Sequence, residues 1–447
     1  MNLLLVLLGL ATAHAVQLGG TGTHTIVLQS DGSVFGFGSD TYGQLGTNST
    51  SQTVPHPVQM LGVSHSTWVS AAWYHSCIVD SNKAKCVGSN ANLQLGATTG
   101  TTSVLVQVSG LSTGVTKVFT GVQNSCALVQ DGMVKCWGFN GWGALGDGTH
   151  VDSLKPMQIA KYLKVKISDV SIGYAHICLL TLSGKVYCSG HNAYGQLGDG
   201  TNWEKSTFAQ VIISANTVLV SVSLGEYHTC VVTVKGLVYC FGRNSYGQLG
   251  DGTKVDSNLP VLVYGLSQVK SVWASLYNTF ALTKNGTALG FGYNIYGSLG
   301  NHGWGFEYSP VVFAQGVVGI QQISGGLWTT CVVTDNDLVE CLGDNSNGQM
   351  GVGQQVDSSL DLMPVVGLAG QSAAPSLQPT LRPTSVPSAS PSASPSMSPT
   401  SSPTPLPTHG PTTSPSFSPT ASPATTTPTT KKNGTQKPTK RPNAGKA

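Results

Sequence analysis

Short apolar runs separated by glycine-rich turns recur along most of the chain. In one stretch an apolar run ends at Gly225, a second extends from Thr229 to Val234, and a tight turn follows at Lys235-Gly236. A third run covers Leu237–Phe241, and after a glycine-rich loop a last short run follows Pro260. None of these runs has the period of an amphipathic helix. The pattern therefore predicts four short β-strands joined by turns.

A six-residue motif marks the repeats of this pattern. It reads TYGQLG at 41–46, AYGQLG at 193–198 and SYGQLG at 245–250, and related forms complete a set of seven. Its last apolar residue falls at positions 45, 95, 145, 197, 249, 299 and 350, so the repeat is 50 to 52 residues long. Four strands in each of seven repeats predict an all-β fold, a seven-bladed β-propeller of four-stranded blades.

The prolines of the repeat region share one place in the repeat. They are expected just before the fourth strand, at Pro55, Pro57, Pro156, Pro260, Pro310 and Pro364. Proline lacks the N–H group that a β-ladder uses, and it is confined largely to edge strands. We therefore expect the fourth strand to be an edge strand.

Charge is scarce and unevenly placed. Only 9% of the 447 residues are Asp, Glu, Lys or Arg, against roughly 25% in ordinary globular domains. All 19 acidic residues and 15 of the 22 basic ones lie at or before Asp361, so that part carries a formal charge of −4 and the remainder +7. So little charge disfavours helical bundles, and an acidic repeat region disfavours a nucleic-acid partner.

The two ends differ from the repeats in composition. Residues 1–15, MNLLLVLLGLATAHA, resemble a cleaved signal peptide; a membrane anchor would need a longer apolar run, and no later stretch approaches the length of a membrane span. The repeats fill 16–370. Residues 371–447 are rich in Ser, Thr and Pro, which predicts a disordered stalk with a basic C-terminus. The stalk is either O-glycosylated or a bare linker.

Ten cysteines fall into pairs that bracket the turn between the second and third strands. The pairs are Cys77/Cys86, Cys126/Cys136, Cys178/Cys188, Cys230/Cys240 and Cys331/Cys341. Repeats one and six lack both partners together, with Ile26 and Gly36, and Phe280 and Gly290, in their places. Paired loss across a hairpin predicts five disulfides within blades, since a metal or redox site would favour C-x-x-C spacing. Disulfides indicate an oxidising, extracellular compartment.

Other recurrent polar residues suit structural roles. One repeat position holds His24, His75, His176 and His228. Metal ligands would have to converge on one point, so we expect each histidine to tie strands within its own blade. D-G-T turns open at Asp147, Asp199 and Asp251, without the clustered oxygen ligands of a calcium site. In the absence of a nucleophile elbow, P-loop or H-E-x-x-H motif, we predict no catalytic residue, metal or cofactor.

Aromatic residues gather just before the repeated histidine position. With one acid they make up a candidate binding face of Trp73, Tyr74, Tyr174, Glu226, Tyr227, Tyr277 and Trp328. All lie in loops between first and second strands, so they should emerge on the same face of the ring. Tyr and Trp dominate binding hot spots, although such rings could instead pack between blades.

The sequence also contains three N-glycosylation sequons and a basic C-terminal segment. N-glycosylation sequons occur at Asn48, Asn285 and Asn433, and the first two fall in expected surface loops. The basic end, KKNGTQKPTKRPNAGKA, could hold anionic wall or matrix polysaccharide, or could serve only as a solubilising terminus.

The repeats at Gly173–Gly198 and Gly225–Gly250 resemble the repeat of the regulator of chromosome condensation family. The resemblance covers about 16–367 and implies a seven-bladed propeller. Asn124, Asn278 and Thr329 replace the family's histidine in three repeats. The family's founding activity, nucleotide exchange on the GTPase Ran with chromatin binding, does not suit a chain with a leader and paired cysteines. Secreted members such as the propeller that inhibits β-lactamase are the closer analogy.

Together these features predict a secreted protein, extracellular or associated with a cell wall or matrix, and monomeric. We expect a non-catalytic scaffold that binds an extracellular protein or glycan through loops on one propeller face. One alternative is a hydrolase or lyase acting on extracellular polysaccharide. The other is a guanine-nucleotide exchange factor for a small GTPase, which would require the leader not to be cleaved.

Overall fold

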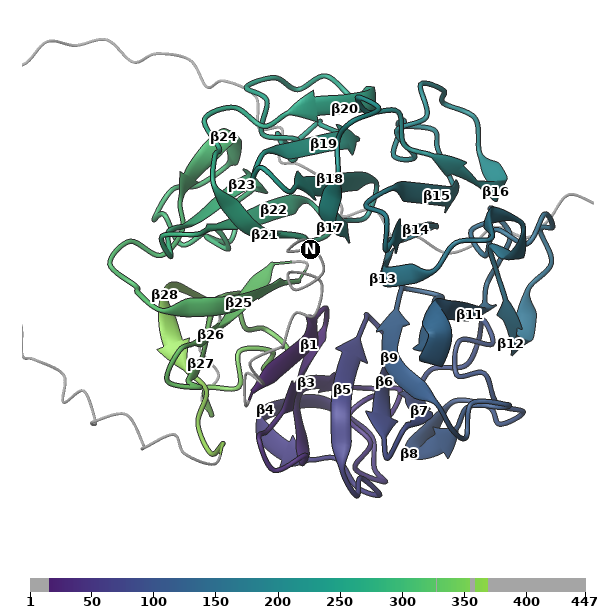
Figure 1. Cartoon of the computed structure of the whole chain (residues 1–447). Coiled ribbons are helices and arrows are strands. Elements are labelled where there is room, and N and C mark those ends of the chain that lie inside the picture. Colours follow the sequence, from purple (N-terminus) through teal and green to yellow (C-terminus); the bar gives the residue numbers. More distant parts are fainter. Residues whose placement is uncertain (1–15, 327, 354–357, 369–447) are drawn as a thin grey trace, which may run out of the picture. The chain divides into compact units, whose positions relative to one another are not determined.

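The computed structural model of the chain describes residues 16–326, 328–353 and 358–368. These residues form seven sheets of four antiparallel strands, arranged around a central axis (Figure 1). The strands of each sheet, or blade, follow one another along the chain, and the first lies nearest the axis. Helix in the described part is limited to two 3-10 turns, Gln130–Gly132 and Lys161–Leu163. The seven-bladed propeller expected from the repeats is confirmed.

The strands of the first three blades are as follows. Blade 1 consists of β1 (Gln17–Thr21), β2 (His24–Leu28), β3 (Val34–Asp40) and β4 (Ser51–Gln59). Blade 2 consists of β5 (Ser66–Ala71), β6 (His75–Asp80), β7 (Lys83–Gly88) and β8 (Thr102–Gln107). Blade 3 consists of β9 (Val115–Thr120), β10 (Asn124–Val129), β11 (Met133–Gly138) and β12 (Ser153–Gln158).

The other four blades repeat this plan. Blade 4 consists of β13 (Ile167–Ile172), β14 (His176–Thr181), β15 (Val186–Gly190) and β16 (Lys205–Gln210). Blade 5 consists of β17 (Leu219–Leu224), β18 (His228–Thr233), β19 (Val238–Gly242) and β20 (Ser257–Leu262). Blade 6 consists of β21 (Val269–Ala274), β22 (Asn278–Thr283), β23 (Ala288–Tyr293) and β24 (Phe306–Val312). Blade 7 consists of β25 (Ile320–Gly325), β26 (Thr329–Thr334), β27 (Val339–Asp344) and β28 (Ser358–Pro364).

The hydrophobic core lies between neighbouring blades. Every residue of the second strands is buried, because each blade packs both of its faces against neighbours. Leu95 of blade 2 and Trp137 of blade 3, both fully buried, belong to one such cluster. The fourth strands form the outer edge of each blade, and every residue of β20 and β28 is at least partly exposed.

The recurrent histidines join neighbouring blades, which differs from the expectation that they tie strands within a blade. The Nε2 atoms of His24, His75, His176 and His228 lie 2.7 to 2.9 Å from a hydroxyl oxygen of the next blade. For His228 this is the hydroxyl of Thr279, which itself donates to the carbonyl of Gln248 at 2.9 Å. The hydroxyl proton is thereby used, so the ring donates from Nε2 and Nδ1 carries no proton.

The same relay recurs at the other three histidines, whose partner hydroxyls also donate to backbone carbonyls. All four Nδ1 atoms are buried without a hydrogen-bond partner. Burial lowers the pKa of each of these histidines to about 3. The rings are therefore neutral hydrogen-bond donors between blades.

Blade 7 meets blade 1 without exchanging a strand, since every blade of the described region keeps four strands of its own. The side chain of Gln322 accepts a hydrogen bond from the N–H of Leu18 at 3.1 Å and donates to its carbonyl at 3.0 Å. The hydroxyl of Thr25 donates to the carbonyl of Gln349 at 3.2 Å. Polar contacts and core packing, including that of Val27 with Val333, therefore close the ring.

The five expected disulfides are confirmed. Each joins directly opposed residues of the second and third strands of one blade, whose Cα atoms are 4.1 Å apart. The bonded pairs are Cys77–Cys86, Cys126–Cys136, Cys178–Cys188, Cys230–Cys240 and Cys331–Cys341. The first pair is one residue closer in sequence than the others, because a two-residue turn, 81–82, joins its strands.

Blade 6 shows what replaces a disulfide. Phe280 faces Gly290 in the same register as the cysteine pairs. A Cβ atom at Gly290 would lie 3.0 Å from Leu299 and 3.3 Å from the Phe280 ring. An aromatic ring opposite glycine thus fills the volume that a disulfide takes elsewhere.

The six prolines lie inside the fourth strands, not before them as expected. Pro260, for example, falls within β20, where Cys240 pairs with Val261 and Gly242 pairs with Ser257. The three residues Asn258, Leu259 and Pro260 thus oppose a single residue, and this bulge leaves the proline without a ladder N–H to supply. The edge-strand interpretation holds, although the strand begins earlier than the sequence indicated.

The glycine-rich loop between the third and fourth strands is fixed by a buried amide. In blade 5 the Oδ1 of Asn244 accepts a hydrogen bond from the N–H of Leu249 at 2.9 Å, and its Nδ2 donates to Asp251 at 3.0 Å. Asp251 also accepts from the N–H of Thr253 at 3.0 Å. The D-G-T aspartates therefore hold turns, as expected.

Candidate functional site

Two sets of loops emerge on one face of the propeller. Because neighbouring strands are antiparallel, the first-to-second and third-to-fourth loops of each blade leave at the same end. A ring contact between the two sets agrees with this, since the Tyr246 and Tyr277 centroids are 5.3 Å apart. We call this surface the loop face. The second-to-third turns and the connections between blades lie on the opposite face.

Aromatic contacts continue across the loop face from blade 3 to blade 5. The ring of Trp142 in blade 3 lies 4.9 Å, centroid to centroid, from that of His191 in blade 4. Tyr227 of blade 5 lies 5.6 Å from both His191 and Tyr174, and 5.2 Å from Tyr194. Rings from three blades thus form one packed cluster.

A cation–π contact and further ring contacts connect this cluster to blade 6. The guanidinium of Arg243 lies 5.3 Å from the Tyr194 ring centre and 5.1 Å from that of Tyr246. Tyr246 in turn contacts Tyr277 and Tyr293 at 5.3 and 5.4 Å. We name the whole set the aromatic arc; it comprises Trp142, Tyr174, His191, Tyr194, Tyr227, Arg243, Tyr246, Tyr277 and Tyr293.

Four of the seven residues singled out from the sequence come together here. Tyr174, Tyr227 and Tyr277 belong to the aromatic arc, and Glu226 lies beside them. The three tyrosines are half-buried. The rings thus combine both uses weighed from the sequence, because they pack on neighbours and also reach the surface.

The other three, Trp73, Tyr74 and Trp328, make no ring contact with the aromatic arc within the described residues. Trp73 and Tyr74 contact each other at 5.8 Å, and Tyr42 packs on Tyr74 at 5.3 Å. Trp328 packs on Tyr296 at 5.0 Å. All of the predicted rings are half-buried, so they are not the most exposed side chains of the loop face.

The predicted disulfide cysteines take no part in the loop face. All ten are fully buried, and none lines the central channel mouth described below. Their sulfur atoms are all used in the five bonds, so the described residues include no free thiol for redox chemistry or metal binding. In each of the five bonded blades the second-strand partner lies two residues after the repeated histidine position. The third-strand partners are Cys86, Cys136, Cys188, Cys240 and Cys341. The cysteines therefore have a structural role inside the blades.

The most exposed apolar side chains of the loop face lie in the third-to-fourth loops, which the sequence analysis did not single out. At or next to one loop position, blades 3 to 6 carry Val151, Trp203, Val255 and Trp304, which are 70, 77, 71 and 68% exposed. The corresponding stretches of blades 1 and 2, residues 47–50 and 98–101, are polar. These residues follow the D-G-T turn or its N-H-G variant, so the repeat register could have revealed them.

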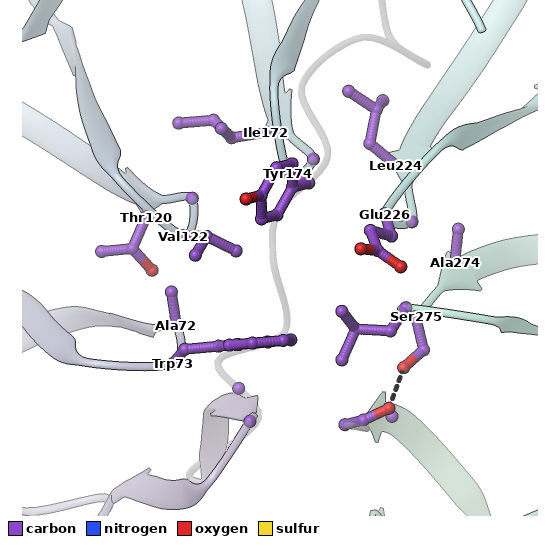
Figure 2. Close-up of a pocket in the computed structure, with 18 of the residues that line it drawn as sticks. Ala72, Trp73, Thr120, Val122, Ile172, Tyr174, Leu224, Glu226, Ala274 and Ser275 are labelled. Atoms are coloured by element: carbon purple, nitrogen blue, oxygen red, sulfur yellow. Dashed lines mark hydrogen bonds between the residues drawn. The ribbon is translucent and has the colours of Figure 1, made fainter. Parts of the chain in front are cut away.

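The central channel opens on the loop face as a cavity of about 150 Å³. Figure 2 shows Trp73, Tyr174 and Glu226 projecting toward its middle from three different blades. Small residues end the first strand or begin the following loop in every blade, which brings the loops close together. A Cβ atom on Gly225, for example, would lie 2.1 Å from the carbonyl oxygen of Ser275.

Glu226 is held in place by backbone contacts to both neighbouring blades. Its N–H donates to the carbonyl of Leu276 at 3.1 Å, and its carbonyl accepts from the N–H of Tyr174 at 3.3 Å. The residue is 9% exposed, and its Oε2 has no hydrogen-bond partner. Burial raises the pKa of Glu226, while Tyr277, the Arg243 guanidinium and Tyr227 oppose that shift.

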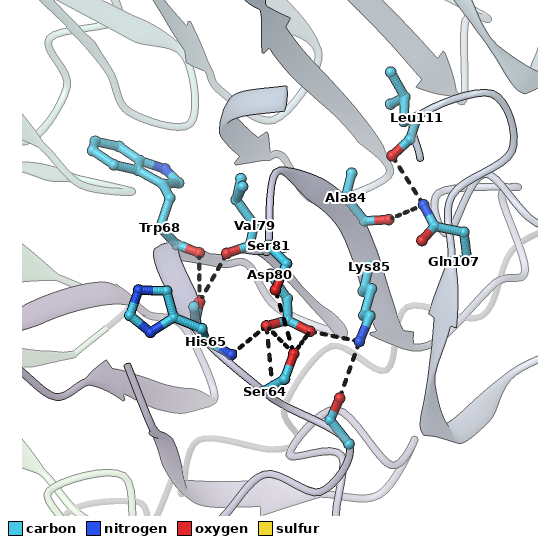
Figure 3. A network of polar contacts seen from close by, with 12 residues as sticks. Ser64, His65, Trp68, Val79, Asp80, Ser81, Ala84, Lys85, Gln107 and Leu111 are labelled. Atoms are coloured by element: carbon cyan, nitrogen blue, oxygen red, sulfur yellow. Dashed lines mark hydrogen bonds and ion pairs between the residues drawn. The ribbon is translucent and has the colours of Figure 1, made fainter. Parts of the chain in front are cut away.

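A dense polar network on the opposite face is structural (Figure 3). The carboxylate of Asp80 accepts hydrogen bonds from the Nζ of Lys85 at 2.6 Å, the N–H of His65 at 2.6 Å and the hydroxyl of Ser64 at 2.9 Å. Burial alone would raise the pKa of Asp80, but these contacts lower it to about 2. With its oxygens already engaged, this carboxylate has little capacity left for a ligand.

Two of the three sequons can be placed. Asn48 is exposed in the third-to-fourth loop of blade 1, and Asn285 is exposed in the second-to-third turn of blade 6. They therefore lie on opposite faces. Asn433 lies outside the described residues.

Neither a metal cluster nor a membrane-spanning helix is found in the described part of the chain. Its residues contain no group of three or more His, Cys, Asp or Glu side chains arranged to hold a metal ion. They also include no helix long and apolar enough to cross a membrane.

Fold and site define a seven-bladed propeller with an aromatic loop face. Models of the regulator of chromosome condensation (RCC1) repeat match residues 31–79, 131–180, 183–232 and 235–282, and a second model of this repeat matches 115–143, 167–196 and 219–248. The chain is therefore an RCC1-repeat protein.

Curated relatives share part of their length with this chain. It is 32% identical over 252 residues to the ultraviolet-B receptor UVR8 of Arabidopsis thaliana, covering 55% of this chain and 57% of that receptor. It is 30% identical over 295 residues to the human E3 ubiquitin-protein ligase HERC2, covering 63% of this chain but 6% of HERC2. The chain thus matches somewhat more than half of the length of UVR8 and only a small part of HERC2.

Solved structures show the same fold. Human WBSCR16 matches with a TM-score of 0.69 and 20% identity, over 75% of this chain and 94% of that one. Yeast RCC1 (Prp20), in its structure with Kap60, matches with a TM-score of 0.68 and 17% identity, over 78% of this chain and 86% of that one.

Proposed function

We propose that this chain is a secreted, monomeric, non-catalytic scaffold that binds an extracellular protein through the part of the loop face formed by blades 3 to 6. The observation that carries the proposal is the row of exposed apolar residues Val151, Trp203, Val255 and Trp304 on the same blades as the aromatic arc. Polar loops on blades 1 and 2 border this region, so the apolar surface is one-sided.

The chemistry of this region favours a protein partner. Trp, Tyr and Arg are enriched at binding hot spots, and each is present here in a packed setting. Arg243, held between two tyrosine rings, is already ordered, so less conformational entropy is lost on binding. A glycan is the second partner class, but exposed residues spread over four blades suit a broad protein surface better than a compact sugar cleft.

The channel lining does not favour glycoside hydrolysis at the channel mouth. Glycoside hydrolysis requires two carboxyl groups flanking the bond, and the described residues that line the channel mouth include one acid, Glu226. The ligase activity in HERC2's name belongs to a protein of which this chain covers 6%.

The compartment and the mode of action have separate support. Five disulfides are typical of secreted proteins. Binding of proteins is a recorded property of a similar propeller, since the yeast Prp20 structure is described with its binding to Gsp1p and histones. A nucleotide-exchange role would place this chain in the cytosol or nucleus, where such disulfides are rare.

Capture by the full chain, secreted from eukaryotic cells, tests the proposal. Wild type, the double variant W203S/W304S and the control Y264S would be compared as baits for extracellular proteins by quantitative mass spectrometry. Trp203 and Trp304 are exposed, so their replacement should leave the fold intact. Tyr264 is 73% exposed in the blade 5–6 connection, on the opposite face.

We expect the double variant to lose its specific partner by at least tenfold, a loss of about 1.4 kcal/mol. The control Y264S should retain the partner. Equal capture by wild type and W203S/W304S, or loss of capture in Y264S alone, would contradict the proposed face.

A further inference from the structure

The channel mouth holds a buried acid that is not fully satisfied. Glu226 is more than nine-tenths buried, its side chain projects toward the middle of the cavity (Figure 2), and its buried Oε2 has no hydrogen-bond partner. Leaving a buried polar atom without a partner is costly, so a bound group that supplies a donor would be stabilised. A cation would serve best, because hydrogen bonds to charged groups are the stronger ones.

Among the described residues, no cationic side chain forms an ion pair with this carboxyl. Arg243 is close enough to influence it, but no ion pair joins them, and the guanidinium lies between the rings of Tyr194 and Tyr246. The side chains of Tyr277 and Tyr227 hydrogen-bond the same carboxyl and oppose the rise in its pKa, but they are neutral groups and do not balance its charge. No Lys, Arg or His is among the described residues that line the mouth or the deeper channel.

Two aromatic rings share the cavity with the acid. Trp73 approaches from blade 2 and Tyr174 from blade 4, while Glu226 lies on blade 5 (Figure 2). Tryptophan and tyrosine faces attract cations within about 6 Å of the ring centre. The remaining wall is small or apolar, with Ala72 and Val122 as examples, and suits the methylene stem of a lysine.

From this juxtaposition we propose that the channel mouth binds the side-chain ammonium of a lysine that a protein partner inserts between Trp73, Tyr174 and Glu226. The ammonium bonds to the carboxylate of Glu226 beside the two ring faces, and the methylene stem of the lysine lies along the small and apolar wall. The inference rests on the proposed protein-binding function and deepens it, because the central lysine would be surrounded by contacts to the aromatic arc.

The test uses a peptide, so it does not depend on finding the partner. The full chain would be titrated with acetyl-Gly-Lys-Gly-amide and with the same peptide acetylated on the lysine side chain, by saturation-transfer NMR. We expect the unmodified peptide to bind and acetylation to weaken binding at least tenfold. The variant E226Q should show the same loss, since it keeps the shape of the side chain but removes its charge.

Matched variants separate the site from general electrostatics. E204Q removes an exposed acid of the third-to-fourth loop of blade 4 and should leave binding unchanged. W73L should weaken binding severalfold, and circular dichroism would confirm that each variant is folded. Equal binding of the peptide by wild type and E226Q, or an equal loss in E204Q, would overturn the lysine site.

The two proposals fail in different ways. Peptide binding that depends on Glu226, without capture through Trp203 and Trp304, would uphold the site and remove the proposed docking face. Capture through that face without Glu226-dependent peptide binding would uphold the docking face and remove the lysine site.

Discussion

Four buried histidines should make this propeller sensitive to mild acid. Each ring is held neutral between blades, with a pKa lowered from 6.5 to about 3 by burial. The unfolded chain binds protons near pH 6.5 that the folded chain does not bind, so stability is complete above that pH and declines as pH falls toward 3. At about 1.4 kcal/mol per pH unit, a fall from pH 6.5 to about 5 removes about 2 kcal/mol per histidine.

Together the four would remove about 8 kcal/mol over that interval, which is comparable to the whole stability of many domains. Asp40, Glu226 and Glu340 act in the opposite direction, because burial raises the pKa of each. Asp80, whose pKa is lowered from 3.8 to about 2, contributes stability that is lost as the pH falls from about 4 toward 2, below that interval. A single-site comparison cancels these carboxyl contributions.

The variant H228N provides that comparison, because blades 3 and 6 carry Asn124 and Asn278 at the same position. Urea unfolding would be followed by the intrinsic fluorescence of the eight tryptophans, of which Trp137 is fully buried, at pH 8, 6.5 and 5. At pH 8 the variant should be less stable by about 1 kcal/mol, the value of a lost hydrogen bond. By pH 5 the difference in unfolding free energy between wild type and H228N should have moved by about 2 kcal/mol in favour of the variant. Parallel pH profiles for wild type and H228N would refute the reasoning.

Two further predictions concern how each blade is held. The variant C230S/C240S should lower the free energy of unfolding by about 2–3 kcal/mol, and C230F/C240G, which copies the blade 6 pair, should recover part of that loss in the same urea assay. The variant G225A should destabilise by at least about 2 kcal/mol because its Cβ meets the carbonyl of blade 6, whereas G100A, with nothing within 4 Å of its Cβ, should change stability by less than about 0.5 kcal/mol. Similar losses in the two glycine variants would contradict the close-approach argument.

The repeat spacing predicted the architecture because each unit has the same strand and turn chemistry. The paired appearance and loss of cysteines predicted the disulfides, since directly opposed hairpin residues are the ones close enough to bond. The prediction that each histidine ties strands within its own blade was wrong, because the histidines join neighbouring blades. A residue on a second strand faces the neighbouring blade, and that packing direction depends on how the blades stack, not on the repeat itself.

The site was predictable only in part for the same reason. Tyr174, Tyr227 and Glu226 were found because their loops precede the repeated histidine. Their contacts with His191, Arg243 and one another depend on blade-to-blade geometry that a single repeat does not encode. Trp203 and Trp304 were missed because they follow a turn whose sequence resembles ordinary loop chemistry. The repeat register places them at or next to one loop position, but the extent of their exposure depends on the structure.

Photo-crosslinking tests the proposed docking face most directly. The full chain would carry benzoylphenylalanine in place of Trp203 or, separately, in place of Tyr264, and would be irradiated in the presence of extracellular proteins. The account predicts that a specific partner crosslinks to position 203, on the loop face, and not to position 264, on the opposite face. Crosslinking of that partner at position 264 with none at 203 would contradict it.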